Sequence, residues 1–280
     1  MSGTALVLGG GGPVGGAWLT GVLAGLAEAG IDLDDGADVV IGTSAGAVFG
    51  SRLRSGAPAA ELYERQLSGA DAVRLPVTVR QTARFLWAAL GSRDPQRSVE
   101  RLARAASDAR TGPQSNVFDT IGGLLGDVRA WPERELRIAA VDAQNGRTEV
   151  FDSRSGATLL EAVAASCAVP VVWPPVTVRG RRWMDGGSRS TANLQLARGY
   201  PRVLAVAPVP RAVGPHPSAS QQAAELSDAG ARVVLLSPDR TARRVMGRNM
   251  ADDARRAAAA RAGYAQARGL APSVAAVWQG

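Results

Sequence analysis

Two glycine-rich turns, each between a strand-like and a helix-like segment, constrain this chain most. The first is GGGGPVGG at residues 9–16, and the second is GTSAG at residues 42–46. Ser44 therefore lies at a sharp strand-to-helix corner, which strains a serine backbone and exposes its hydroxyl. Gly42 and Gly46 lack the side chains that would keep strand and helix apart. The second turn thus has the form of a nucleophile elbow.

A serine that caps an ordinary helix is the simpler interpretation of GTSAG, because serine and glycine are common in such loops. The first turn argues against it, since unhindered backbone N–H groups in a glycine-rich turn can face a negatively charged oxygen. Together the two turns predict a nucleophilic Ser44 beside an oxyanion cradle.

The order of the segments predicts an α/β fold. The 280 residues are 46% hydrophobic and no low-complexity linker divides them, so we expect a single domain over residues 1–280. Apolar runs alternate with Ala-rich helical segments. Predicted elements include strands at 4–8, 148–151 and 232–236 and a helix at 159–166.

The helical pattern from 58 to about 127 predicts a helical insertion that covers the site, and a C-terminal helix is expected around 250–268. Within the insertion, residues 78–90 mix arginines with bulky apolar side chains. Contact with a lipid surface is one interpretation of this mixture, but we favour a helix packed on the sheet.

Charge and composition exclude several functions. All 32 basic residues are arginine, and the net charge is +7. The arginines are interleaved with acids and lack the aromatic-plus-basic clusters of a nucleic-acid site, so we expect no nucleic-acid partner. Without lysine there is no P-loop and no lysine nucleophile. The sequence shows no His/Cys cluster for a metal, and we expect neither metal nor cofactor.

We expect a cytoplasmic protein. The N-terminus has no basic leader, and the longest apolar region, residues 159–178, is interrupted by one glutamate and three prolines. The single Cys167 forms no internal disulfide, fits a reducing compartment and is expected to be a small core residue. Peripheral contact with a membrane surface and the oligomeric state stay open.

Two candidates could serve as the base that activates Ser44. His216, the one histidine, lies in a proline-bracketed segment that has the features of an exposed loop, yet the order Ser44, Asp185, His216 matches an α/β-hydrolase triad. Asp185 could instead bond to the serine directly, because it follows an apolar strand and the DGG turn at 185–187 leaves its carboxylate open. A plain turn also explains DGG.

The motifs GGGGPVG, GTSAG and DGG, in this order, resemble those of the patatin-like phospholipases, and the resemblance runs nearly the whole chain. Residues 165–170 and 173–176 are similar to the family's segment before its aspartate. The resemblance implies a three-layer α/β/α sandwich with a mainly parallel central sheet. It also implies a hydrolase that cleaves lipid or phospholipid esters through an acyl-enzyme.

By this resemblance, Ser44 is the nucleophile and Asp185 the base of a Ser-Asp dyad without histidine. The implied oxyanion hole and the other motif glycines are Gly10, Gly11 and Gly12, then Gly15, Gly42, Gly46, Gly186 and Gly187.

The first motif departs from the family pattern. Many members carry Arg or Lys just before its last glycine, whereas this chain has Val14 before Gly15, and Pro13 lacks an N–H. We expect the oxyanion hole to work through the preceding glycines and any charge role of the basic residue to be lost.

Two other functions are alternatives to a hydrolase. The first turn also matches a dinucleotide fingerprint, GxGxxG at 10–15, with acidic residues at 32–35. In that fold the ribose-binding acid ends the second strand, whereas here Asp38 begins that strand and Ser44 follows it. A non-catalytic lipid-binding or scaffold role is disfavoured by the intact Ser44 and Asp185.

Overall fold

The structure is a computed structural model that describes residues 3–73 and 77–278. At its centre lies one mixed sheet. Its strands are β1 (Thr4–Leu8), β2 (Val39–Thr43), β3 (Glu135–Asp142), β4 (Thr148–Phe151), β5 (Val176–Val178), β6 (Arg181–Asp185), β7 (Arg202–Val206) and β8 (Arg232–Leu236). The order is β5-β6-β3-β2-β1-β7-β8, with β4 also paired to β3. Strands β3, β2, β1, β7 and β8 run parallel, and β4, β5 and β6 form antiparallel pairs.

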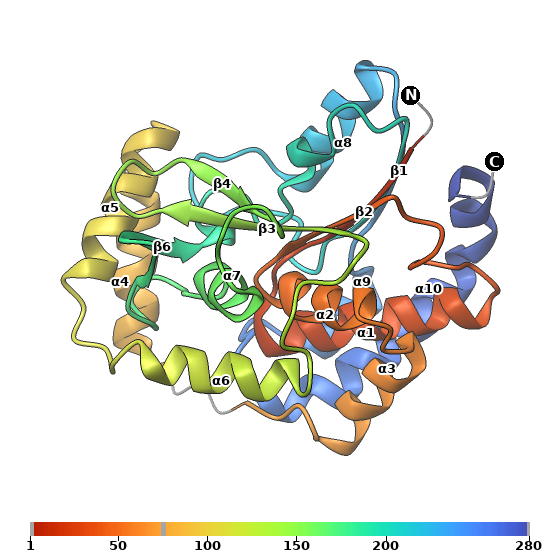
Figure 1. Ribbon diagram of the computed structural model, residues 1–280, viewed down its shortest axis with the longest axis horizontal. Helices are drawn as coiled ribbons and strands as arrows, with labels where there is room; N and C mark the ends of the chain where they lie inside the picture. Colours follow the sequence, from red (N-terminus) through yellow and green to blue (C-terminus); the bar gives the residue numbers. More distant parts are fainter. Residues whose placement is uncertain (1–2, 74–76, 279–280) are drawn as a thin grey trace.

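Helices surround the sheet (Figure 1). The α-helices are α1 (Gly12–Glu28), α2 (Ala45–Arg54), α3 (Ala59–Ser68), α4 (Val79–Leu90), α5 (Pro95–Ser107), α6 (Ser115–Leu125), α7 (Leu159–Ser166), α8 (Ala219–Asp228), α9 (Arg240–Met246) and α10 (Arg256–Trp278). Short 3₁₀ helices are η1 (Gly186–Ser188), η2 (Leu194–Ala197) and η3 (Asp253–Arg255).

Side chains of the central strands alternate between two apolar clusters. In β1, Leu6 and Leu8 join the larger cluster with residues of α1, α2 and α10, whereas Ala5 and Val7 join the smaller cluster with residues of η2 and α8. Each β1 residue is buried, as expected for a parallel strand covered on both faces. The predicted α/β class with a mostly parallel central sheet is confirmed.

The C-terminal helix differs from its predicted range. It begins at Arg256 rather than near 250 and continues through Pro272 to Trp278. Its extension beyond residue 268 is packed into the core, because Ala271, Val274 and Trp278 belong to the larger apolar cluster. Before the helix, Gly247 has a φ of 72°, and the chain up to 255 makes turns and η3 instead of a helix.

The predicted packing of residues 78–90 on the sheet is wrong. Helix α4 instead packs on α5 and on the segments around Val171 and Val213, in an apolar cluster separate from those of the sheet. The two helices lie together at the left of Figure 1. Small residues let them approach, since Ala88 and Ala89 of α4 share this cluster with Leu102 of α5. Helix α4 thus packs against its neighbour in the sequence, α5, rather than against the sheet.

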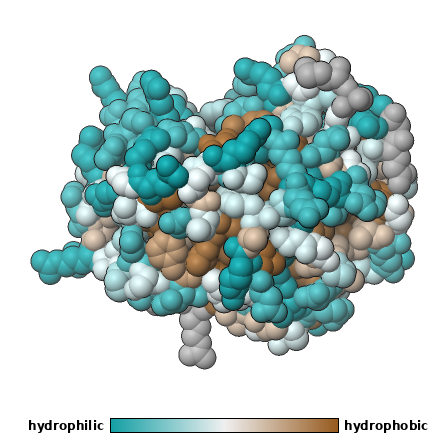
Figure 2. Space-filling view, viewed as in Figure 1, coloured by the Kyte–Doolittle hydropathy of each residue, from teal (hydrophilic) through white to brown (hydrophobic). Residues whose placement is uncertain are grey.

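The surface is mixed in polarity. The face drawn in Figure 2 is largely hydrophilic at its rim, and apolar residues gather near its middle. Among the described helices, none is both long enough and apolar enough to cross a bilayer.

Candidate active site

Both glycine turns lie at one edge of the sheet. Strands β1 and β2 are parallel neighbours, with Leu8 beside Gly42, so the turns that follow them emerge side by side. A Cβ at Gly46 would lie 2.0 Å from the carbonyl oxygen of Leu8, and a Cβ at Gly10 would lie 3.1 Å from the Cβ of Ser44. Only glycine at position 46 permits this approach of α2 to β1.

Strand β6 brings Asp185 to the same edge from the opposite direction. Asp185 pairs with Ala140 of β3, and the preceding residue of β3, Ala139, pairs with Thr43 at the end of β2. Strand β6 therefore ends at the same edge of the sheet at which Ser44 follows β2. Ser44 and Asp185 are 141 positions apart in the sequence, and only strand β3 separates the strands that carry them.

Ser44 has the strained backbone predicted for a nucleophile elbow. Its φ is 53° and its ψ is −119°, a conformation that a non-glycine residue adopts only when its surroundings hold it there. The Ser44 N–H donates to the Ser166 hydroxyl (N to Oγ 2.8 Å), which donates to the carbonyl of Ala139 (Oγ to O 2.6 Å). These two bonds fix the corner against β3 and α7.

The carboxyl group of Asp185 is almost fully buried. The side chain accepts the N–H of Gly187 (N to Oδ1 2.6 Å), and the Asp185 N–H donates to the carbonyl of Ala168 (2.9 Å). Burial raises the pKa of Asp185 to about 6, although the neighbouring Ser44 side chain and the Gly187 N–H act to lower this pKa. A carboxylate with this pKa is a stronger base than an exposed one.

The three glycines expected to bind an oxyanion differ in availability. The Gly10 N–H already donates to the carbonyl of Thr191 (N to O 2.7 Å). Within the described residues, no hydrogen bond engages the N–H groups of Gly11 and Gly12. Both groups lie at the start of α1, where the helix dipole favours negative charge. The N–H groups of Gly11 and Gly12 are thus available to an oxyanion in this structure, whereas the Gly10 N–H, which we also expected to contribute, is engaged.

Ser44 lines two hollows. A cleft of about 340 Å³ is bordered by Ser44, Asp185 and the 10–12 turn, by residues of α4, and by residues 248–251. A smaller cavity of about 80 Å³ lies on another side of Ser44 and is lined mainly by apolar residues of α2, α6 and the 167–173 segment. Ser44 therefore borders both a small, mainly apolar cavity and a larger cleft whose lining includes the polar side chains Gln81, Arg248 and Asn249.

One exposed cation borders the cleft. Arg248 is exposed, and it makes no hydrogen bond or ion pair with any other residue in the described part of the chain. It belongs to the segment that crosses the first glycine turn, because the Met250 carbonyl accepts the Val14 N–H (N to O 3.0 Å). A basic side chain thus reaches the cleft from a different part of the chain than position 14.

Sequence reasoning missed two residues that hold the Ser44 corner, Ser166 and Asn193. The Ser166 hydroxyl accepts the Ser44 N–H. Cys167, expected to be a small core residue, belongs to the larger apolar cluster and also lines the smaller cavity, and burial chiefly raises its thiol pKa. Asn193, with φ 53°, donates to the Thr43 hydroxyl (Nδ2 to Oγ1 3.1 Å) and to the Gly186 carbonyl (3.3 Å). Only the turn-forming character of the stretch after DGG hinted at Asn193.

His216 is not brought to the site. It does not line either hollow, and its buried Nε2 has no hydrogen-bond partner among the described residues. Burial, with a smaller effect of Arg189, lowers its pKa to about 4. The segment is half-buried rather than the exposed loop we expected.

The acids of the dinucleotide alternative have structural partners. Asp38 precedes β2 and accepts the Thr4 N–H (N to Oδ2 2.6 Å), at the edge of the sheet opposite the glycine turns. Asp34 pairs with Arg54 (Oδ1 to Nη1 2.9 Å). No strand-ending carboxylate faces the GxGxxG turn from these described positions.

Comparisons with known proteins bear on the family and the fold of the chain. A family model described as patatin-like phospholipase matches residues 6–198, well over half of the chain. No curated protein matches it significantly. Among solved structures, the chain is similar to VipD from Legionella pneumophila, with a TM-score of 0.53 and 15% identity over 98% of this chain and 67% of VipD. This likeness shows the fold alone.

A weaker similarity is to the type III effector protein ExoU, with a TM-score of 0.41 and 13% identity over 98% of this chain and 53% of ExoU. That score is too low to support any inference.

Proposed function

Because the chain belongs to the patatin-like phospholipase family and is a lipid acyl hydrolase, we propose that Ser44 and Asp185 are its catalytic dyad. The observation that carries the proposal is their meeting in one cleft, with a strained serine beside a buried carboxylate whose pKa is raised to about 6. Asp185 acts as base, and His216 takes no part.

In the acylation step, Asp185 accepts the proton of the Ser44 hydroxyl while Oγ attacks the ester carbonyl carbon. The tetrahedral oxyanion accepts hydrogen bonds from the N–H groups of Gly11 and Gly12, which stabilise developing charge. Collapse breaks the ester C–O bond, and Asp185 returns the proton to the departing alcohol.

Deacylation uses the same groups. Asp185 takes a proton from water as the water oxygen attacks the acyl-Ser44 carbonyl. The carboxylic acid leaves, and the proton returns to the Ser44 oxygen. No cofactor enters either step.

We assign the two hollows to the two parts of a lipid ester. The apolar lining of the smaller cavity suits the first carbons of the acyl chain. The cleft would hold the leaving alcohol, and Arg248 would pair with a phosphate of its headgroup. We therefore infer a phospholipid substrate and contact with a membrane surface. The cytoplasmic location stays a prediction from the sequence.

Hydrolysis of p-nitrophenyl butyrate tests the dyad. Ser44→Ala and Asp185→Asn should each lower kcat by about 10³-fold or more, because each removes half of the proton-transfer pair. Ser68→Ala and Asp127→Asn, the same changes at exposed positions, are the controls. Near-wild-type turnover in either dyad variant would refute the role of that residue.

A separate comparison tests the headgroup assignment. Arg248→Gln should raise KM for a phospholipid in mixed micelles by about 10-fold and leave a neutral diacylglycerol almost unaffected, because only the former offers a phosphate. Arg244→Gln, an exposed arginine of α9 that does not line the cleft, is the control. Equal effects on both lipids would argue against a phosphate contact.

A further inference from the structure

The large exposed apolar side chains of the described residues all belong to α4. Val79 is 88% exposed, Leu86 40%, Trp87 69% and Leu90 62%. With the exposed Ala83, they recur at helical spacing and form one continuous stripe, which we call the α4 stripe. Single exposed apolar residues are ordinary, but a stripe that gathers them on one helix indicates an interaction surface.

The opposite side of α4 is already packed. Phe85, Ala88 and Ala89 contact the neighbouring cluster with α5, and Gln81 donates to the carbonyl of Val171 (Nε2 to O 3.1 Å). The Ser98 hydroxyl of α5 donates to the Ala89 carbonyl (2.7 Å). The helix is therefore held with the stripe outward, and rotating the stripe inward would break these contacts.

The same helix forms one wall of the catalytic cleft. Gln81, Thr82 and Phe85 line the cleft together with Ser44 and Asp185. Thr82 is also exposed, so this wall reaches the surface beside the stripe. A flat partner seated on the stripe would lie next to the cleft that receives the substrate.

Charge around the stripe favours an anionic partner. Residues 77–111 contain seven arginines against three acidic residues. Arg80, Arg93 and Arg97 are exposed, and the guanidinium carbon of Arg101 lies 4.3 Å from the centre of the Trp87 ring. Trp and Leu on one side with arginines at the flanks are typical of helices that lie in the interface of a bilayer.

We propose that the α4 stripe docks the enzyme on the surface of an anionic phospholipid bilayer, with the cleft beside the lipid. The choice of a bilayer over a protein rests on the proposed function, which requires a lipid ester, and on the arginines around the stripe. The apolar side chains enter the acyl boundary, and the arginines contact lipid phosphates.

Vesicle co-sedimentation tests this surface. The vesicles are made of ether-linked phosphatidylcholine and phosphatidylglycerol, which have no carboxylic ester for the enzyme to cleave. Wild-type protein should bind them, and more weakly when phosphatidylglycerol is omitted or salt is raised. Ala83→Glu and the double variant Trp87→Ala, Leu90→Ala should each weaken binding by about 10-fold or more. Ala265→Glu, which places the same charge at an exposed position of α10, should bind as wild type.

Two further readouts separate this proposal from the dyad. Turnover of soluble p-nitrophenyl butyrate should be unchanged in the stripe variants, and Ser44→Ala should bind vesicles like wild type while it hydrolyses nothing. No vesicle binding by the wild type, or equal binding by Ala83→Glu and Ala265→Glu, would overturn the proposal. So would a dimer, seen by light scattering, that Ala83→Glu dissociates, because the stripe would then cover a second copy.

Discussion

Asp185 occupies a site in which its charged form is disfavoured, and two properties of the protein depend on that. Burial raises its pKa to about 6, well above that of an exposed aspartate. The carboxylate therefore holds a proton more readily as a base, and it is still ionised at neutral pH. Both consequences can be measured separately, one through the rate and one through the stability.

The rate should follow the ionisation of Asp185. Ester hydrolysis requires the carboxylate, so kcat/KM should rise on a single acid limb with a midpoint near pH 6 and level off above it. His216→Gln should leave this profile unchanged, because His216 lies outside the cleft. Initial rates measured from about pH 4 to about pH 9 give the pH profiles of the wild type and of His216→Gln. If the limb moved or vanished in His216→Gln, a histidine base would be indicated.

Stability should respond in the opposite sense. The pKa of Asp185 is higher in the folded than in the unfolded chain, so the stability that its protonated form contributes is present below about pH 4 and lost as pH rises through 6. Asp185→Asn keeps an uncharged side chain at every pH. It should increase the free energy of unfolding at pH 8 by up to about 3 kcal/mol, and much less at pH 4.

Urea unfolding at the two pH values measures this difference. A variant that loses more stability at pH 8 than at pH 4 would mean that Asp185 is stabilised as a carboxylate, against the direction of its pKa shift.

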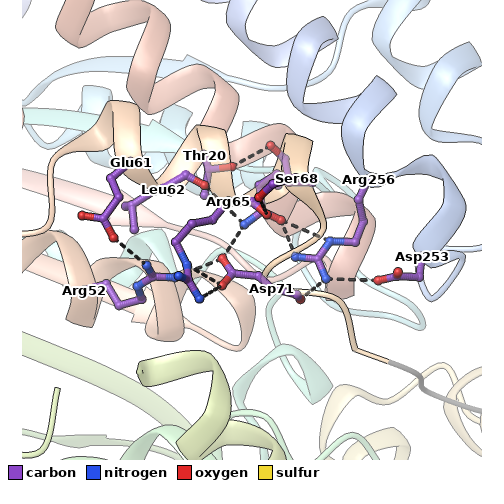
Figure 3. A network of polar contacts seen from close by, with 11 residues as sticks. Thr20, Arg52, Glu61, Leu62, Arg65, Ser68, Asp71, Asp253 and Arg256 are labelled. Atoms are coloured by element: carbon purple, nitrogen blue, oxygen red, sulfur yellow. Dashed lines mark hydrogen bonds and ion pairs between the residues drawn. The ribbon is translucent and has the colours of Figure 1, made fainter. Parts of the chain in front are cut away.

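At the scale of the elements, a buried network fixes the helix that begins after Ser44 (Figure 3). Asp71 follows α3 and accepts from Arg52 of α2 (Oδ2 to Nη1 3.0 Å) and from Arg65 of α3 (Oδ1 to Nε 2.8 Å). Its backbone carbonyl accepts from Arg256 at the start of α10. The Asp71 side chain thus connects α2 with α3, and the Asp71 backbone carbonyl connects them to α10.

Removing that charge should be costly. Asp71→Asn leaves the buried Arg52 with only the exposed Glu61 as its counter-charge and breaks the ion pair with the half-buried Arg65, so it should lower the free energy of unfolding by about 3 kcal/mol. Asp35→Asn, the same change at a carboxylate that is 83% exposed, should stay within about 1 kcal/mol. Equal m-values in urea are needed for the comparison. A loss no larger than that of Asp35→Asn would show that packing alone holds α2.

Local signals determined how far the elements could be predicted. The predicted strands at 4–8, 148–151 and 232–236 and the helix at 159–166 have the observed bounds. Helix α7 begins with a capping box, in which Thr158 and Glu161 exchange hydrogen bonds. Residues close together in the sequence therefore determine where this helix starts. Helix α4 was placed correctly but its partner was not, because the choice between α5 and the sheet depends on tertiary packing.

The same limit applies within the candidate site. Ser44, Asp185 and the glycines of both turns could be proposed from motifs, since strand-to-helix corners have local signatures. The sequence could not predict which backbone N–H groups are free, because Gly10 donates its N–H to Thr191, a residue 181 positions away. Ser166 and Asn193 were missed for the same reason. Ser166 bonds Ser44 and Ala139, and Asn193 bonds Thr43, all of which are distant in the sequence.

At the scale of the whole molecule, the sheet order explains why distant motifs act together. The adjacent order β6-β3-β2-β1 places the DGG, GTSAG and glycine-rich turns along one edge. The larger apolar cluster draws on residues from Leu6 to Trp278, and we therefore propose that the chain folds as one domain. In the proposed docking on a bilayer, helix α4 orients this edge of the sheet towards the membrane. Helix α4 carries the α4 stripe, and it also forms a wall of the cleft.

Covalent labelling with a fluorophosphonate probe tests the Ser44–Asp185 dyad most directly, because the probe reacts only with an activated serine. Mass spectrometry of the digested protein should find the adduct on Ser44 in the wild type and at the same rate in His216→Gln. In Asp185→Asn the labelling rate should fall by about 10²-fold or more, since general-base assistance is lost. An adduct on another serine, or undiminished labelling of Ser44 in Asp185→Asn together with its loss in His216→Gln, would contradict the dyad.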